Sequence, residues 1–339
     1  MERAGLDGLG DISVKDVYMH ADILATERPG PLELFRRWEA QQWSLSDLDF
    51  STDRDEWARM DPQIRAELHS TFSAFFVGEQ AVTDTLSPLI VGAPDEESRL
   101  FLSTQMLDEA RHSFFFSRFW EEAIGVGGAI SAQLNDARPW TATMDYRQVF
   151  DHDLPGVTEA AANGRTNPAL WIEAVTLYHI LVEGTLALPA QRMVLESLRD
   201  LKVLNAFRKG FTAVTRDESR HVSFGVWALH RAASTGMIDG ITTSLNRSLE
   251  PILRIWLSPE EHFIPVEVAD GGQSQPEWPW EPVVESLMKR LTAARLPHAY
   301  LLTVKQNCRD ILRRAAMDYR DRWGEEHPSA RSPFLTATA

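Results

Sequence analysis

The feature that most constrains this chain is a pair of similar motifs, Asp-Glu-Ala-Arg-His at 108–112 and Asp-Glu-Ser-Arg-His at 217–221. In each motif a glutamate precedes a histidine by three residues, which places both side chains on one face of an α-helix, about one turn apart. A carboxylate and an imidazole that converge in this way can bind a metal such as iron or manganese. One copy alone fits a solvated helix face with a surface ion pair better than a metal site, but two copies in apolar helical patterns favour a metal site.

Composition restricts the class of protein. The chain has 339 residues, of which 44% are hydrophobic and 24% are charged, as is usual for a globular protein with a substantial core. A net charge of -15 argues against a nucleic-acid partner, because phosphate backbones are bound by basic patches. The single cysteine, Cys308, excludes an internal disulfide and a thiolate zinc site and fits a reducing cytoplasm. We find no signal-peptide core and no apolar run of about 18 residues, so we expect no membrane span.

A helical pattern from Pro62 to Leu89 supplies an isolated glutamate. Its apolar residues recur at three- and four-residue steps, at Phe72, Phe75, Phe76, Val82 and Leu86. Glu79 lies in the middle of this stripe, where an unpaired carboxylate is costly to bury. Glu79 is therefore either a metal ligand or an ion-paired residue at the edge of the stripe.

A second isolated glutamate lies on a helix predicted from Pro168 to Arg199. Glu183 follows the apolar run Tyr-His-Ile-Leu-Val at 178–182, whereas Glu173 is near the helix start, where a carboxylate is common. Pro189 predicts a kink just past Glu183. The two motifs lie on helices predicted at 95–124 and 201–233. One isolated glutamate thus precedes each motif, and the two halves form a degenerate repeat of a helix pair.

The rest of the chain predicts further helices and no strand of any length. We expect an irregular segment at 1–30, a short helix at 31–42, and a helix start with N-cap side chains at 51–53. Residues 125–166 are predicted to be a crossover with a short helical piece at 146–150. Helices are expected at 241–257, 280–295 and 299–323, with a linker at 270–279 and a disordered tail at 324–339. The prediction is all-α: a single helical domain at 31–323, with a four-helix metal-binding core and flanking helices.

In ferritin-like bundles, two Glu-x-x-His pairs and one glutamate from each of two other helices form a dinuclear carboxylate site. The six candidate ligands here provide four carboxylates and two imidazoles, which balance two divalent ions and suit iron or manganese better than zinc. The reaction class implied is activation of O₂ at a reduced dinuclear centre. Asp108 and Asp217 are either groups that orient the histidines or ordinary surface aspartates.

Several of these segments together resemble the ribonucleotide reductase small-subunit superfamily over residues 35–235. They are the run at 43–57, the pair at 78–79, the run at 182–184 and the two motifs at 108–112 and 216–221. Within the superfamily the chain is most similar to the ligand-binding oxidases that have a heterodinuclear Mn/Fe site. This resemblance implies one Mn and one Fe per chain, with Fe/Fe as the alternative. The implied ligands are Glu79, Glu109 and His112 for Mn, and Glu183, Glu218 and His221 for Fe.

The resemblance also assigns positions that are not ligands. Trp43 and Asp217 match a tryptophan and an aspartate that surround the metals, and Asp217 is expected to orient His112. Phe116 stands where a reductase small subunit has its radical tyrosine, one turn after the ligand histidine. Val82 and Tyr178 stand where the ligand-binding oxidases join a valine Cβ to a tyrosine. Each of these two residues alone fits core packing, but their joint match in register favours the oxidases.

Three hypotheses follow from the sequence. The leading one is a cytoplasmic two-electron C–H oxidase that uses O₂, acts first on Val82 and then on a bound long-chain fatty acid or similar apolar small molecule, and forms a homodimer. The second is a reductase small subunit without the radical tyrosine, which Phe116 motivates and which requires a large-subunit partner. The third is a non-enzymatic, ferritin-like metal-binding protein. The resemblance does not extend beyond about residue 240.

Overall fold

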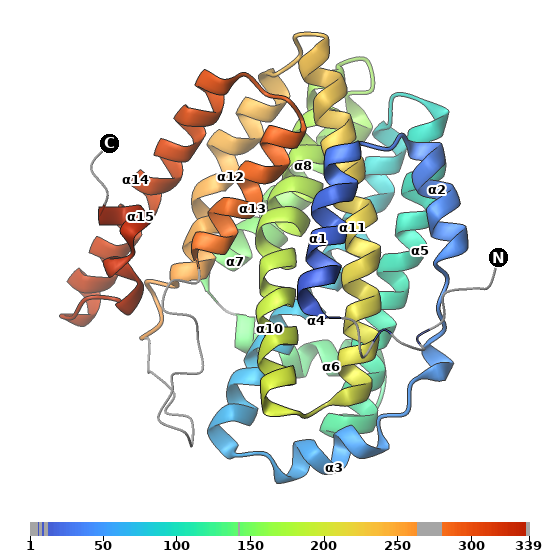
Figure 1. The fold of residues 1–339 in the computed structure, drawn as a ribbon, viewed down its shortest axis with the longest axis vertical. Helices are drawn as coiled ribbons and strands as arrows, with labels where there is room; N and C mark the ends of the chain where they lie inside the picture. The colour runs from blue at the N-terminus through green and yellow to red at the C-terminus, as the bar shows by residue number, and fades with distance from the viewer. Residues whose placement is uncertain (1–5, 7–8, 10–12, 142, 263–279, 337–339) are drawn as a thin grey trace.

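A computed structural model of the chain describes residues 6, 9, 13–141, 143–262 and 280–336 (Figure 1). These residues form helices joined by short connections, and this part of the chain contains no strand. The all-α prediction is therefore confirmed. The linker predicted at 270–279 lies outside the described residues.

The helices follow one another in a simple order. The α-helices are α1 (Val14–Glu27), α2 (Pro31–Ala40), α3 (Ser51–Arg59), α4 (Pro62–Gly92), α5 (Glu96–Phe119), α6 (Ile130–Ala137), α7 (Met144–Arg147), α8 (Leu154–Asn163), α9 (Pro168–Val175), α10 (Leu188–Leu201), α11 (Asn205–Ser234), α12 (Asp239–Leu257), α13 (Trp280–Ala293), α14 (His298–Trp323) and α15 (Pro333–Thr336). π-Helical segments cover Trp120–Ile124, Gln148–Asp153 and Thr176–Ala187. Short 3₁₀ segments cover Leu45–Asp47, Arg138–Thr141 and Pro328–Arg331.

The helices that carry the candidate ligands pack together as the core of the bundle. Helix α4 packs along α5, and α11 packs on α5 and on the π-helical segment between α9 and α10. Gly210 of α11 allows one of these close approaches, because a Cβ there would lie 2.3 Å from the Phe115 ring of α5. The four long helices predicted from the sequence are all present, with ends that differ by a few residues.

Local sequence explains where these helices begin. The Asp61 carboxylate accepts hydrogen bonds from the first turn of α4, and Asp95 does the same for α5. Helix α11 has no such residue of its own. Instead, Asp53 of α3 accepts hydrogen bonds from the N–H groups of Ala206 and Phe207 at 3.1 and 2.7 Å. Helix α3 starts at Ser51 as predicted, but Asp53 caps a distant helix instead of its own.

Two terminal predictions were wrong. Residues 14–27 of the segment expected to be irregular form α1, whose buried face packs against α11. Its apolar residues are spread around the helix and interleaved with charged ones, which hides the helical period in the sequence. At the other end, the tail expected to be disordered contains the 3₁₀ segment and α15. The guanidinium Nε–H groups of Arg309 and Arg313 in α14 donate to backbone carbonyls of α15.

The crossover is more helical than predicted. Residues 125–166 contain α6, α7 and α8, where the sequence indicated only a short piece at 146–150. Helix α8 packs closely against α4, and Gly92 makes this possible, because a Cβ there would lie 2.8 Å from the backbone of Ala161. The glycines, prolines and asparagines that suggested loops instead mark the ends of these short helices.

The helical stretch Pro168–Leu201 is long and apolar enough to cross a membrane by length and composition. However, 83% of its most apolar window is buried inside the protein. Helices α12 and α13 cover this stretch, and α14 lies outside them at the edge of the molecule (Figure 1). Its apolar character is therefore explained by its place in the core.

Candidate metal centre

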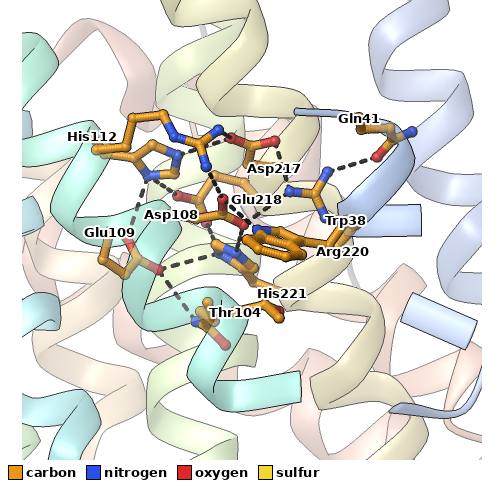
Figure 2. A network of polar contacts seen from close by, with 12 residues as sticks. Trp38, Gln41, Thr104, Asp108, Glu109, His112, Asp217, Glu218, Arg220 and His221 are labelled. Atoms are coloured by element: carbon orange, nitrogen blue, oxygen red, sulfur yellow. Dashed lines mark hydrogen bonds and ion pairs between the residues drawn. The ribbon is translucent and has the colours of Figure 1, made fainter. Parts of the chain in front are cut away.

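The structure brings all six candidate ligands together in the interior. Ligand atoms of Glu79, Glu109, His112 and Glu218 lie within 4.8 Å of one another, and so do those of a second group, Glu109, Glu183, Glu218 and His221. All six side chains are buried. Four of them are seen in Figure 2, with the two histidine rings between the helices that supply the carboxylates.

Two of the glutamates belong to both groups. Glu109 and Glu218, one from each sequence motif, each have ligand atoms within reach of both candidate positions. The oxygens of Glu109 lie 3.3 Å from Nδ1 of His112 and 3.2 Å from Nδ1 of His221. The sequence assigned each of these glutamates to one metal. By their position both glutamates could be shared between two ions, whereas Glu79 and Glu183 each belong to one group only.

Six buried ligand atoms make no hydrogen bond, and they indicate whether metal ions fit this site. The atoms in question are Oε2 of all four glutamates and Nδ1 of both histidines, and each is buried without a hydrogen-bond partner. Buried polar atoms without partners are costly and rare, so six of them in one cluster need an explanation. Two divalent cations provide it, because four carboxylates balance their charge and both imidazoles present a free nitrogen.

Burial and neighbouring charges shift the pKa values within the cluster. Burial raises the pKa of Glu79 to about 8, and burial together with Glu218 raises that of Glu183 well above its usual value. Burial opposes the charged form of His112, but the Glu79 carboxylate raises its pKa overall. Burial also opposes ionisation of Glu109, yet the charge of His221 holds its pKa far below normal. Without metals the cluster therefore holds protons, which bound cations would displace.

Each histidine is oriented by an aspartate and a tryptophan. Asp217 accepts a hydrogen bond from Nε1 of Trp43 at 2.7 Å and lies 3.4 Å from Nε2 of His112. This is the arrangement that the sequence predicted. A matching set exists for the other histidine. Asp108 accepts from Nε1 of Trp38 at 3.0 Å and lies 3.2 Å from Nε2 of His221 (Figure 2).

These contacts cross between the halves of the bundle. The aspartate of the first motif supports the histidine of the second motif, and the aspartate of the second supports the histidine of the first. No motif in the sequence pointed to Trp38. Its only signal was a tryptophan placed five residues before Trp43, in a short helix that showed no link to the metal site.

The arginine that precedes each histidine completes this network. Arg220 is buried and donates to Asp108 at 2.9 Å and to Asp217 at 2.7 Å. Arg111 donates to Asp108 at 3.1 Å and also lies near Asp217. Although burial opposes ionisation of Asp217, Arg220 holds its pKa well below the usual value. The shared Arg-His ending of the two motifs was visible in the sequence, but its role was not.

A further polar contact exists on one side only. Gln105 of α5 is fully buried and donates through its amide to Glu183 at 2.8 Å and to Glu109 at 3.3 Å. Its amide oxygen lies 2.9 Å from Nε2 of His179. Burial lowers the pKa of His179 to about 3, so its ring is neutral and donates to this oxygen. Neither residue was predicted, because a lone glutamine and a lone histidine in apolar helices carry no signal.

The two residues proposed to react with each other are in contact. The Tyr178 hydroxyl donates to the backbone carbonyl of Val82 at 3.0 Å, and both side chains are buried. Val82 lies one helical turn after Glu79, and Tyr178 lies on the π-helical segment that carries Glu183. The structure therefore places this pair beside the candidate ligands.

Phe116 occupies an aromatic cluster. Its ring is fully buried, with the centroids of Phe115, Phe76 and Phe211 at 5.3, 6.0 and 5.9 Å. The position at which reductase small subunits carry a radical tyrosine is therefore apolar in this chain.

The fold and the residue cluster define a ferritin-like helical protein with a candidate dinuclear carboxylate centre. No protein-family model matches the chain. Among solved structures, it is similar to the R2-like ligand-binding oxidase from Sulfolobus acidocaldarius, with a TM-score of 0.63 and 22% identity over 78% of this chain and 89% of that chain. An R2-like ligand-binding oxidase with aerobically reconstituted Mn/Fe cofactor matches with a TM-score of 0.60 and 20% identity, over 86% and 91% of the two chains. The particular fold is thus that of the R2-like ligand-binding oxidases, as the sequence motifs predicted.

Proposed function

We propose that this protein is an O₂-dependent oxidase with a dinuclear Mn/Fe centre that performs two-electron oxidation of C–H bonds. The observation that carries the proposal is the Tyr178 hydroxyl on Val82, beside a cluster of six orphaned ligand atoms. The solved structures with the same fold are described as ligand-binding oxidases, and one carries a reconstituted Mn/Fe cofactor.

The residues divide into terminal and shared ligands. Glu79 and His112 would hold Mn, Glu183 and His221 would hold Fe, and Glu109 and Glu218 would be shared between the two ions. An Fe/Fe centre is the alternative with the same ligands. When bound, the two ions would supply the redox chemistry that reduces O₂. The protein supplies fixed carboxylates, two imidazoles held by Asp108 and Asp217, and a dry aromatic surrounding.

The first C–H bond to be oxidised is that of Val82. The Cβ–H bond of Val82 and the O–H bond of Tyr178 break, an ether bond forms between Oη and Cβ, and the chain loses two hydrogen atoms. This step gives up two electrons and two protons to O₂, and the bound ions, once reduced, would supply the other two electrons that reduction of O₂ to water requires, with the remaining two protons from solvent. The contact between Tyr178 and Val82 holds the hydroxyl next to the residue that it would join.

Intact-mass spectrometry after loading with Mn and Fe and exposure to air tests this proposal. The expected result is a loss of two hydrogen atoms and a linked peptide that contains residues 82 and 178. Tyr178→Phe is the matched control, because it keeps the ring and removes the hydroxyl, and it should keep its full mass. An unchanged mass in the aerated, metal-loaded protein would rule out the cross-link.

The Phe116 environment separates this proposal only from a reductase subunit that stores a tyrosyl radical. A radical tyrosine requires a phenol at that position, and the aromatic cluster around Phe116 has none. A reductase subunit without that tyrosine is separated by its need for a large-subunit partner: no complex and no nucleotide reduction on mixing with a large subunit would exclude it. A storage protein is distinguished by stoichiometry. We expect a metal titration to end at two ions per chain, whereas a ferritin-like store would take up many.

We propose a long-chain fatty acid as the ligand, with its carboxylate at the metals and its chain among apolar residues. The support is the resemblance in sequence and the ligand-binding oxidases that share the fold. Organic extraction of the purified, metal-loaded protein followed by mass spectrometry should recover about one fatty acid per chain. Protein prepared without metal should retain little, because the carboxylate would lack its partner.

We also propose a cytoplasmic homodimer. The support for the dimer is an exposed apolar stripe on α5, where Leu100, Leu107 and Phe114 are 50%, 53% and 50% exposed. Ser103 and Ala110 lie between them, so large and small residues alternate at the three- and four-residue steps of a helix–helix seam. A stripe of this kind can pack against the same stripe of a second copy across a two-fold axis, as in an isologous interface. Light scattering should give a dimer for the natural chain and a monomer for Leu107→Glu.

A further inference from the structure

The π-helical segment Thr176–Ala187 determines which residues face the candidate metal centre. Tyr178 and Glu183 are five residues apart, which on an α-helix would place them about 140° apart around the axis. In a π-helix five residues close roughly one turn, so both side chains point to the same side. The contacts of Tyr178 with Val82 and of Glu183 with Gln105 show that both do. The segment is therefore part of the site, and what stabilises it matters.

This segment has a gap in its backbone hydrogen bonding. The N–H of Leu188 donates to the carbonyl of Glu183, five residues earlier. The next donor in the same pattern would be residue 189, which is a proline and has no N–H. The carbonyl of Gly184 therefore receives no hydrogen bond from that position, although Gly184 is a buried residue.

A residue from a distant part of the chain fills the gap. Ser286 of α13 is buried, and its hydroxyl donates to the carbonyl of Gly184 at 2.6 Å. The absence of a side chain at residue 184 helps α13 to come close. A Cβ there would lie 3.1 Å from the carbonyl oxygen of His179 and 3.6 Å from Cγ of Arg290 in α13. Pro189 thus removes a backbone donor, the Ser286 hydroxyl replaces it, and Gly184 leaves room for α13.

We infer that Ser286 is a positioning residue, which stabilises the π-helical segment and thereby keeps Glu183 and Tyr178 directed at the candidate metal centre. Ser286 lies outside residues 35–235, to which the sequence resemblance is confined. A buried carbonyl without a partner destabilises the conformation that exposes it, so loss of the hydroxyl favours opening of this segment. Helix α13 therefore both covers the bundle and supplies the hydroxyl that stabilises the π-helical segment.

Hydrogen exchange in the metal-free protein tests this role directly. Ser286→Ala should make the amides of Thr176–Ala187 exchange roughly tenfold faster, while α4 and α5 remain unchanged. Ser286→Thr keeps the hydroxyl and should restore slow exchange. Ser223→Ala is the matched control, because its hydroxyl also bonds to a buried carbonyl, that of Ser219, but within the regular helix α11. It should leave Thr176–Ala187 unaffected.

A second substitution separates the missing hydrogen bond from a general loss of stability. Pro189→Ala returns an N–H to the position that can reach Gly184. In the Ser286→Ala background it should slow the exchange of Thr176–Ala187 back toward the natural rate. Equal exchange in Ser286→Ala and the natural chain, or faster exchange throughout the molecule, would overturn the inference. So would a double variant that exchanges as fast as Ser286→Ala alone.

The part of the inference that concerns Glu183 rests on the proposed function. Metal titration of the same variants should show roughly 10- to 100-fold weaker binding of one ion in Ser286→Ala and little change for the other. Equal weakening of both ions would contradict a specific effect on Glu183. A natural chain that binds no metal would refute the proposed centre, whereas the exchange experiment would still decide the role of Ser286.

Discussion

The two halves of the bundle offer the same ligands on different backbones. In the first half, Glu79 lies on the α-helix Pro62–Gly92. In the second half, the equivalent Glu183 lies on a π-helical segment of 12 residues. The helices that carry Glu109 and Glu218 are α-helical around both motifs. The difference is thus confined to one of the four helices.

This comparison shows how a repeated sequence can produce two unequal metal positions. The supports of the histidines are equivalent, with Trp38 and Asp108 on one side and Trp43 and Asp217 on the other. The terminal glutamates are not equivalent. Glu183 receives a hydrogen bond from Gln105, and no described group donates in the same way to Glu79. A site that distinguishes Mn from Fe requires an asymmetry of this kind.

The largest expected effect comes from removing a shared ligand. Glu109→Ala should abolish binding of both ions, because both groups of ligands contain this carboxylate. Glu79→Ala and Glu183→Ala should each remove mainly one ion. Elemental analysis after metal loading and desalting gives the number of ions per chain.

A matched control for these variants is Glu173→Ala. Glu173 is also a buried glutamate, but it pairs with Arg247 away from the ligands. It should retain two ions per chain. One ion retained in Glu109→Ala would mean that Glu109 is a terminal ligand, as the sequence alone suggested.

Each aspartate contacts the histidine of the other motif, so replacing an aspartate should weaken the metal position in the other half of the bundle. Asp217→Asn should weaken the ion held by His112, and Asp108→Asn the ion held by His221, each by roughly 10- to 100-fold. Anomalous diffraction at the Mn and Fe edges reports the occupancy of each position. A larger effect of Asp108→Asn on the position of His112 than on that of His221 would contradict the crossed arrangement.

The pKa shifts predict that metal binding is weaker in acid. Burial raises the pKa of Glu79 to about 8, so this carboxyl is largely protonated at pH 7 in the metal-free protein, and burial together with Glu218 also raises the pKa of Glu183. Each bound cation must displace protons, and apparent affinity should therefore rise about tenfold per pH unit for each proton released, until the pH exceeds about 8. Calorimetry in buffers of different ionisation enthalpy counts these protons. Affinity that is constant from pH 6 to pH 8 would contradict the shifts.

The tryptophans should give the smallest effect. Trp43→Phe and Trp38→Phe each remove one hydrogen bond to an aspartate, which is expected to lower the free energy of unfolding by about 1 kcal/mol. Trp43 should cost more, because it is buried and Trp38 is only partly so. Urea denaturation of the metal-free proteins measures the difference. Equal values would indicate that the two supports are energetically equivalent despite their different burial.

The sequence predicted what depends on spacing along one helix. The pairs Glu109/His112 and Glu218/His221 follow from the helical period, and Glu79 and Glu183 from carboxylates in apolar stripes. It could not predict contacts between segments far apart in the chain, such as Trp38 on Asp108 or Ser286 on Gly184. A kink from Pro189 was expected just after Glu183, but the distortion begins at Thr176, before it. Pro189 indicated that a backbone hydrogen bond of the helix is missing. It did not indicate which hydrogen-bond pattern replaces the α-helical one.

The position of Arg220 between the two aspartates predicts how binding of one ion would affect binding of the other. Arg220 touches both aspartates, and each aspartate holds the histidine of a different position. An ion that fixed His112 would therefore also restrain Asp217, Arg220 and Asp108, and through them the ring of His221. Occupation of one position prepares the other, so loading of the two ions should be cooperative. The identity of the first ion to arrive would then influence which metal the protein accepts second.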